Sequence, residues 1–206
     1  MVTDDHIVSI ADGIEQGRGI FDNLRKAMAY IVSVHVTIVG LALLPLAVPD
    51  WPLVLLPLQV ALLELIIDPA CSVVFQAEQH DPQVMERPPR RPGAPILGRP
   101  VLVISLIQGV VVLVVLVMVY LGAVWGDRPP EVVRSVTFCA LALSNLGLIL
   151  VNRSWRLSAV TALARRRNTA LPWILVGTAV GLTTLMAVPG LREALGFGPL
   201  TATNDW

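Results

Sequence analysis

Charged residues, cysteines and aromatic residues are all scarce in this sequence. Of 206 residues, 15% are charged, 5% are aromatic, two are cysteines and one, Lys26, is a lysine. The sequence has no G-x-x-x-x-G-K-[ST] segment, which excludes a P-loop nucleotide site. Cys71 and Cys139 both fall inside apolar runs and do not indicate a disulfide framework. We interpret them as small buried thiols, with a soft-metal ligand as the alternative for Cys71.

Polar motifs for catalysis or nucleic-acid binding are also lacking. The 15 basic and 15 acidic residues give a formal net charge of zero, so nothing indicates a nucleic-acid partner. The three histidines, His6, His35 and His80, are far apart, and none lies in a Ser-His-Asp or Cys-His motif. These absences direct attention to the apolar part of the chain.

The sequence is 55% hydrophobic and contains long apolar stretches. They cover residues 27–48, 52–76, 100–125, 132–151 and 169–188. Each can cross a hydrocarbon core of about 30 Å, which takes about 20 helical residues. Because lipid offers no hydrogen-bond partner to the backbone, each stretch is expected to be a helix. The predicted fold is an all-α, polytopic transmembrane helix bundle with about five spans.

The basic residues are distributed unevenly between the connections. Twelve of the 15 lie before the first span, in the second connection or in the fourth. By the positive-inside rule, the N-terminus is expected in the cytosol and the C-terminus outside. The membrane is expected to be the plasma (inner) membrane. Residues 1–26 hold no apolar signal-peptide core and are expected to be a cytosolic lead-in. Residues 201–206 are then a short external tail.

One segment within the second span, "LLELIIDPACS" at 62–72, holds two acidic residues among apolar ones. Glu64 and Asp68 are four residues apart and therefore share one face of a helix. Pro69 cannot donate a hydrogen bond to the carbonyl of Leu65, so it frees an oxygen near both carboxylates. Together these oxygens suit a hard cation. The alternative is two protonated acids that hydrogen-bond to neighbouring groups near a helix end.

Other spans carry polar residues at a similar expected depth. They are Ser33, His35 and Thr37 in the first span, and Ser144 and Asn145 in the fourth. A single histidine in a membrane helix can equally be a hydrogen-bonded packing residue. Polar groups from three spans at one depth nevertheless favour an ion site, because an intramembrane acid normally faces the bundle interior, a water path or an ion.

Three segments resemble the C-terminal membrane part of type II P-type cation ATPases, the group that contains the calcium and sodium–potassium pumps. The segments are "GRGIFDNLRKAMAYIVSVHV" (17–36), "LLPLQVALLELIIDP" (55–69) and "DPQVMERPPRRPGAPIL" (81–97). The resemblance runs from about residue 7 to the end. It implies that residues 27–200 form the membrane domain and that the five spans correspond to the fifth through ninth helices of a ten-helix pump.

The resemblance also implies a set of cation ligands. Asp68 matches the family's ion-binding aspartate, and Glu64 stands where calcium pumps have an amide. His35 occupies the position of a coordinating amide, and Asn145 lies in the polar patch of the eighth helix. Ile38 and Ile67 replace a glutamate and a hydroxyl residue, which argues against ordinary calcium specificity. Imidazole suits transition metals or protons better than calcium.

Several parts of such a pump have no counterpart in this sequence. They are the phosphorylated aspartate, the nucleotide-binding and actuator domains, and the first four membrane helices. The predicted function is therefore the cation-binding membrane domain of a P-type ATPase that cannot hydrolyse ATP alone. The alternative is a non-enzymatic, vestigial or regulatory membrane protein that associates with another pump. No cofactor is expected, and the transported cation stays open among calcium, manganese, another divalent ion and the proton. Expected partners are the lipid bilayer, that cation, and an N-terminal pump half or a second copy.

Overall fold

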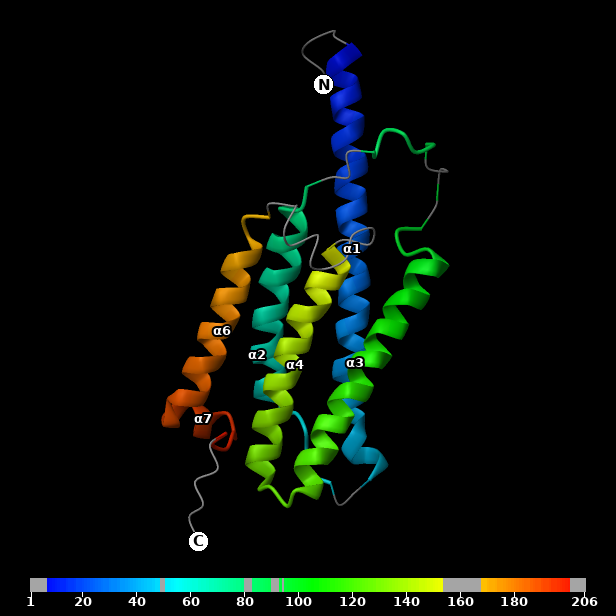
Figure 1. Cartoon of the computed structure of the whole chain (residues 1–206). Helices are drawn as coiled ribbons and strands as arrows, with labels where there is room; N and C mark the ends of the chain where they lie inside the picture. Colours follow the sequence, from blue (N-terminus) through cyan, green and yellow to red (C-terminus); the bar gives the residue numbers. More distant parts are fainter. Residues whose placement is uncertain are drawn as a thin grey trace.

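The computed structural model describes residues 7–48, 51–79, 83–89, 93, 95–153 and 168–200, without the side chains of Ile7, Asp68 and Ala70. All regular structure in these residues is helical, which confirms the predicted fold class. The helices are α1 (Ile7–Ala47), α2 (Pro57–Pro69), the π-helix η1 (Ala70–Val74), α3 (Arg99–Trp125), α4 (Pro130–Arg153), α6 (Leu171–Ala187) and α7 (Pro189–Ala194). The long helices run side by side as a bundle (Figure 1).

Four helical segments are long and apolar enough to cross a membrane: α1, α2 with η1, α3 and α4. The fifth predicted span corresponds to α6, which has 17 residues. That length is at the lower limit for crossing a bilayer. Beyond Val188 the chain continues into the short helix α7.

Two helix boundaries differ from the predicted spans. The first helix begins at Ile7 rather than near residue 27, so the polar lead-in and the first span form one helix of 41 residues. No proline interrupts residues 7–44, and the helix can therefore extend. The second helix begins at Pro57 rather than residue 52. A proline is favoured in a first helical turn, where its missing N–H has no helical partner to lose.

We call the end of the bundle nearest the start of α1 the lead-in end, and the end where α3 connects to α4 the turn end (Figure 1). At the lead-in end, Arg18 donates hydrogen bonds to the carbonyls of Val84 and Arg87, at 3.0 and 2.9 Å. Arg87 in turn forms an ion pair with Asp22 at 2.6 Å. These contacts attach the segment that follows α2 to the part of α1 that precedes the span.

Helices α1 and α3 pack closely at mid-height. A Cβ atom added to Gly109 would lie 2.7 Å from the carbonyl oxygen of Ser33 and 2.7 Å from Val36 Cβ, so only glycine permits this approach. The Ser33 hydroxyl donates to the Ser105 carbonyl at 2.9 Å, and the Thr37 hydroxyl donates to the Gly109 carbonyl at 3.2 Å. Small residues commonly allow membrane helices to approach in this way.

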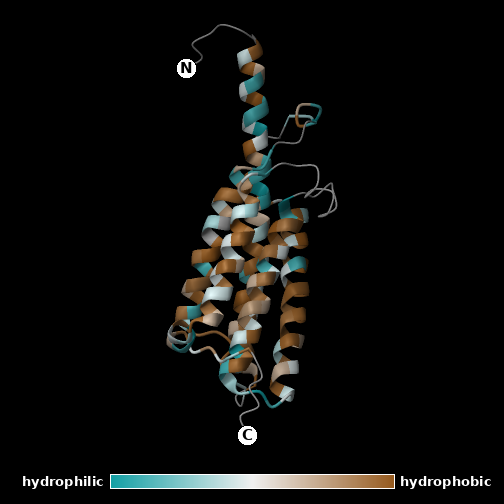
Figure 2. Ribbon diagram, turned by 60° about the vertical axis from the view of Figure 1, so that its left-hand side comes forward, coloured by the Kyte–Doolittle hydropathy of each residue, from teal (hydrophilic) through white to brown (hydrophobic). Residues whose placement is uncertain are grey.

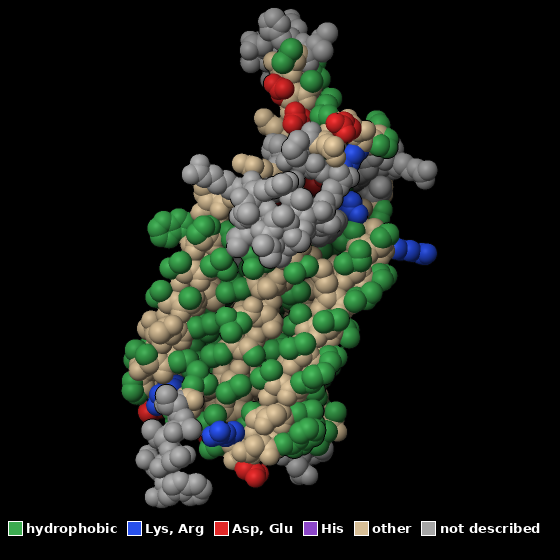
Figure 3. Space-filling model, viewed as in Figure 1, with side chains coloured by type: hydrophobic (Ala, Val, Ile, Leu, Met, Phe, Trp, Pro, Cys, Tyr) green, Lys and Arg blue, Asp and Glu red, His purple; other side chains and the backbone are tan. Residues whose placement is uncertain are grey.

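Hydrophobic residues cover the outside of the bundle along its middle. Figure 2 shows hydrophobic colours over the spans and more hydrophilic colours on the part of α1 beyond them. In Figure 3 the basic and acidic side chains of the visible face lie toward the two ends, and hydrophobic side chains cover the region between. This distribution is the one expected of a bundle that lies in lipid.

Candidate cation site

The two acidic residues of the predicted site lie on α2, one turn apart, each next to a buried residue. Leu63 and Ile67 are buried, at 0% and 2% exposure. Glu64 and Asp68 each follow one of them, so both positions are rotated by about 100° from the buried stripe. The Glu64 side chain is half-buried. The side chain of Asp68 lies outside the described part, and a joint ligand set therefore stays a prediction.

The helix changes its hydrogen-bonding pattern directly after these residues. The α-helix runs through Pro69 and continues as the π-helix Ala70–Val74. π-helical turns are uncommon and often occur at functional sites, because the extra residue per turn redirects side chains and backbone groups. The sequence predicted a freed carbonyl at Leu65, which stays a prediction. The irregularity that the structure shows begins after Pro69, on the C-terminal side of both acids.

Asn145 is a polar residue in the interior of the bundle, on α4. Only 2% of its surface is exposed. Neither its Nδ2 nor its Oδ1 has a hydrogen-bond partner among the described residues. An unsatisfied buried polar group costs about 1–3 kcal/mol. A fold retains such a group most readily where a ligand completes its hydrogen bonds or coordination.

Asn145 lies in the second half of α4, between two buried leucines. This helix packs against both α1 and α2, the helices that carry the other predicted ligands. Leu141 and Leu148 lie about one turn on either side of Asn145 and belong to the same hydrophobic core as Ile38 and Ile67. The amide therefore lies in the interior of the bundle, among apolar side chains.

The polar residues of α1 have different surroundings. The side chain of His35 is exposed, and its Nδ1 lies 2.9 Å from the Ile31 carbonyl oxygen of its own helix. Ser33 and Thr37 are fully buried, and both bond to α3. The structure thus uses the two hydroxyl groups for packing and leaves the imidazole on the surface. Among the described residues, no three His, Cys, Asp or Glu side chains are grouped to hold a metal ion.

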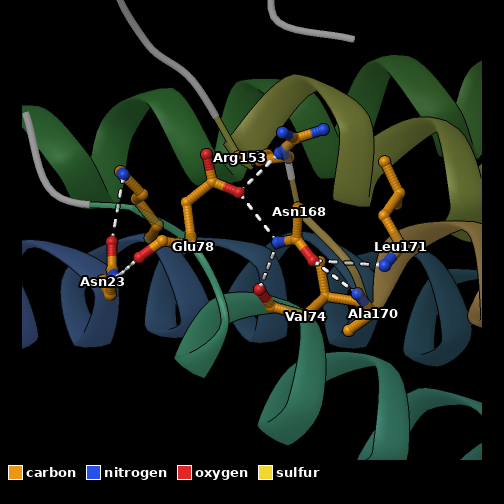
Figure 4. Close-up of polar contacts among 8 residues, drawn as sticks. Asn23, Val74, Glu78, Arg153, Asn168, Ala170 and Leu171 are labelled. Atoms are coloured by element: carbon orange, nitrogen blue, oxygen red, sulfur yellow. Dashed lines mark hydrogen bonds and ion pairs between the residues drawn. The ribbon is translucent and has the colours of Figure 1, made fainter. Parts of the chain in front are cut away.

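A second polar cluster, at the lead-in end, was not predicted from the sequence. We call Glu78, Arg153 and Asn168 the clasp (Figure 4). Arg153 Nε lies 2.5 Å from Glu78 Oε2. Asn168 Nδ2 donates to Glu78 Oε2 at 2.9 Å and to the Val74 carbonyl at 2.8 Å. The three residues are 1–7% exposed.

The clasp connects four helices. Glu78 follows η1, Arg153 ends α4, and Asn168 accepts hydrogen bonds from the N–H groups of Ala170 and Leu171 at the start of α6. Asn23 of α1 donates to the Glu78 carbonyl at 2.7 Å. The sequence had placed Arg153 only among the basic residues outside the spans. Its partner is 75 residues away, and no local pattern identifies it.

Comparison with known proteins assigns the chain to a family. The sequence model described as "Cation transporting ATPase, C-terminus" matches residues 52–206. The chain belongs to this family. A calcium-transporting ATPase of Listeria monocytogenes is 26% identical to this chain, and the match covers all of this chain. A calcium-transporting ATPase of Bacillus subtilis is 28% identical over 71% of this chain. The sodium/potassium-transporting ATPase alpha subunit of Drosophila melanogaster is 35% identical over 45% of it.

These similarities confirm the resemblance to P-type cation ATPases. They cover a limited part of the relatives, because this C-terminal ATPase domain spans 23% of the length of the Listeria protein and 16% of the Bacillus protein. The domain is thus a multi-pass membrane part of a cation-transporting ATPase.

Proposed function

We propose that this domain binds the transported cation between α2 and α4, with Glu64, Asp68 and Asn145 as ligands. The observation that carries the proposal is the buried Asn145 amide, whose two polar atoms have no partner in the described structure. It lies on the helix that packs against both α1 and α2. Carboxylate and amide oxygens together suit a hard cation.

The position of His35 suggests how the site would be completed. Its ring is exposed on α1, where a further helix can pack against it. We propose that this face contacts membrane helices from the N-terminal part of a whole pump, so that His35 reaches the cation pathway only in that assembly. The cation stays open among calcium, manganese, another divalent ion and the proton. No observation favours the alternative of a vestigial or regulatory protein.

The test is a chimera in which residues 17–200 replace the corresponding part of the Listeria calcium-transporting ATPase. Phosphorylation from ATP is titrated with calcium, manganese, zinc and protons. Glu64→Gln and Asp68→Asn should each lower the apparent affinity for the activating cation, because each removes a charged oxygen ligand. Asp127→Asn is the matched control, since it makes the same chemical change in the α3–α4 turn. Unchanged affinities for every cation in the first two variants would show that the acids are structural.

The orientation of the domain is a further part of this proposal. Arg18, Arg87, Arg99 and Arg153 belong to the lead-in end of the bundle, which we place in the cytosol, with residue 206 outside. Single cysteines at Glu86 and Asp127 in a Cys71→Ala/Cys139→Ala background test this. A membrane-impermeant maleimide added to intact cells should label position 127 and spare position 86. Labelling of position 86 alone would show that the domain has the opposite orientation.

A further inference from the structure

The turn end of the bundle contains a cavity of about 600 Å³ that the cation site does not use. Its lining includes two arginines, Arg128 and Arg192, and two acids, Glu131 and Glu193, which we call the rim. Its wall includes the apolar surfaces of Gly122 and Val136, from α3 and α4. A charged rim above an apolar wall, at the end of a membrane span, matches the two parts of a phospholipid.

Hydrogen bonds hold the wall of this cavity in place. The N–H of Gly198 donates to the Glu131 carbonyl at 2.9 Å, and the Ser135 hydroxyl donates to the Gly198 carbonyl at 2.8 Å. Arg134 Nε donates to the Gly196 carbonyl at 2.9 Å. A Cβ atom at Gly198 would lie 2.8 Å from the backbone nitrogen of Val132, so glycine permits this contact. The segment after α7 is therefore fixed against α4 before any ligand binds.

The guanidinium of Arg192, a residue that lines the cavity, is weakly bonded in the described structure. Arg192 Nε is buried and makes no hydrogen bond in the described structure. The same guanidinium reaches the Met186 carbonyl only at 3.5 Å, through Nη1. A guanidinium with free donors favours a phosphate oxygen, which it can bind through two parallel hydrogen bonds. Arg128 supplies a second positive charge at the same rim.

The balance of charge selects the class of lipid. Two arginines and two acids line the rim, and Arg134 lies 3.6 Å from one of these acids, Glu131. Glu193 is the acid left to repel an anionic headgroup and to accept a hydrogen bond from an ammonium group. A headgroup with a phosphate and a primary ammonium can use both signs. A trimethylated ammonium cannot donate hydrogen bonds to the carboxylates. We propose that this cavity binds the headgroup of phosphatidylethanolamine, with one acyl chain along the apolar wall.

Native mass spectrometry of the purified 206-residue chain tests the proposal. The chain is delipidated in detergent and titrated separately with phosphatidylethanolamine, phosphatidylglycerol and phosphatidylcholine. Phosphatidylethanolamine should be retained at about tenfold lower concentration than either of the others, since a charge-assisted hydrogen bond is worth about one such factor. Inorganic phosphate should not displace it, because phosphate makes no contact with the apolar wall.

Two double variants separate the roles of the charges. Arg128→Gln/Arg192→Gln should lower retention of phosphatidylethanolamine about tenfold. Glu131→Gln/Glu193→Gln should also lower retention of phosphatidylethanolamine. It should raise retention of phosphatidylglycerol above that of phosphatidylethanolamine, because only the positive charges of the rim remain. This gain cannot result from loss of the fold. The control Arg99→Gln/Glu86→Gln changes the same residue types outside the cavity. It should leave the retention of all three lipids unchanged.

Three results would overturn the proposal. One is equal retention of phosphatidylethanolamine and phosphatidylglycerol by the parental chain. Another is displacement of the lipid by inorganic phosphate. The third is an acid-to-amide variant that keeps the parental order of the lipids.

Discussion

Two groups of buried polar side chains in this domain differ in how their bonding needs are met. At the lead-in end, Arg153 pairs with Glu78, and Asn168 bonds to both the acid and the backbone. Deeper in α4, two helical turns before Arg153, Asn145 is equally buried and has no partner in the described structure. One helix therefore carries a bonded polar group near its end and an unbonded one within the membrane span.

The difference should appear in stability, because paired and unpaired buried polar groups contribute differently to it. An ion pair removed from water is tolerated when its charges are paired, as those of Glu78 and Arg153 are. An unmatched amide lowers the stability of the fold. Substitutions in the clasp should therefore lower stability, whereas an apolar residue in place of Asn145 should not.

The largest expected effect on stability comes from Arg153→Met. It leaves the Glu78 carboxylate buried beside Asn168 without its guanidinium, and removing one partner of a buried ion pair costs about 3–5 kcal/mol. Thermal unfolding of the purified chain in detergent should show a clear fall in the unfolding midpoint. Arg99→Met, at an exposed arginine of the same end, is the control and should have little effect.

The double variant Glu78→Leu/Arg153→Met extends that test. Replacing both charges by apolar groups should restore part of the stability lost by Arg153→Met, because no uncompensated charge stays buried. A double variant as unstable as the single one would show that the hydrogen bonds of Asn168 and the backbone, rather than the charge pair, stabilise this end.

The contact between α1 and α3 should give an intermediate effect. Gly109→Ala places a Cβ atom 2.7 Å from the Ser33 carbonyl oxygen, so the two helices must separate and the bonds from Ser33 and Thr37 must lengthen. We expect a loss of about 1–3 kcal/mol. The control is Gly177→Ala on α6, where a Cβ atom has nothing within 4 Å. That variant should unfold at the parental temperature or above it, and an equal fall in both would remove the packing explanation.

The smallest effect is expected at the ion pair between Asp22 and Arg87. Their side chains are 24% and 36% exposed, unlike those of the clasp. Partly exposed ion pairs contribute about 1 kcal/mol or less. Asp22→Asn should therefore move the unfolding midpoint far less than Arg153→Met does, and 1 M salt should reduce even that change. A loss comparable to that of Arg153→Met would mean that burial does not separate the two pairs.

The sequence predicted the spans well because lipid imposes a simple rule of length and hydrophobicity. The runs at 100–125 and 132–151 correspond to α3 and α4 within two residues at each end. The rule contains no information about polar segments, so it did not show that α1 begins at Ile7. It also missed the clasp, since the pairing of Glu78 with Arg153 depends on how α2 and α4 pack and not on any local spacing.

The burial of the candidate site residues was harder to predict from the sequence. A buried polar residue at mid-span is visible in the sequence, and Asn145 is such a residue. Which side of a helix faces the core is harder to infer when almost every neighbour is apolar. His35 illustrates this, because Ser33 and Thr37 on the same helix are buried while its own ring is exposed.

The central claim is that the fold leaves the Asn145 amide unbonded so that it can bind a cation. The most direct measurement compares Asn145→Leu with the parental sequence in the chimeric pump, for both apparent cation affinity and unfolding temperature. Leucine has a similar shape and removes an unsatisfied amide, so the unfolding temperature should hold or rise, as expected for a change worth about 1–3 kcal/mol. The affinity should fall. An unchanged affinity, or a loss of stability like that of Arg153→Met, would contradict the account.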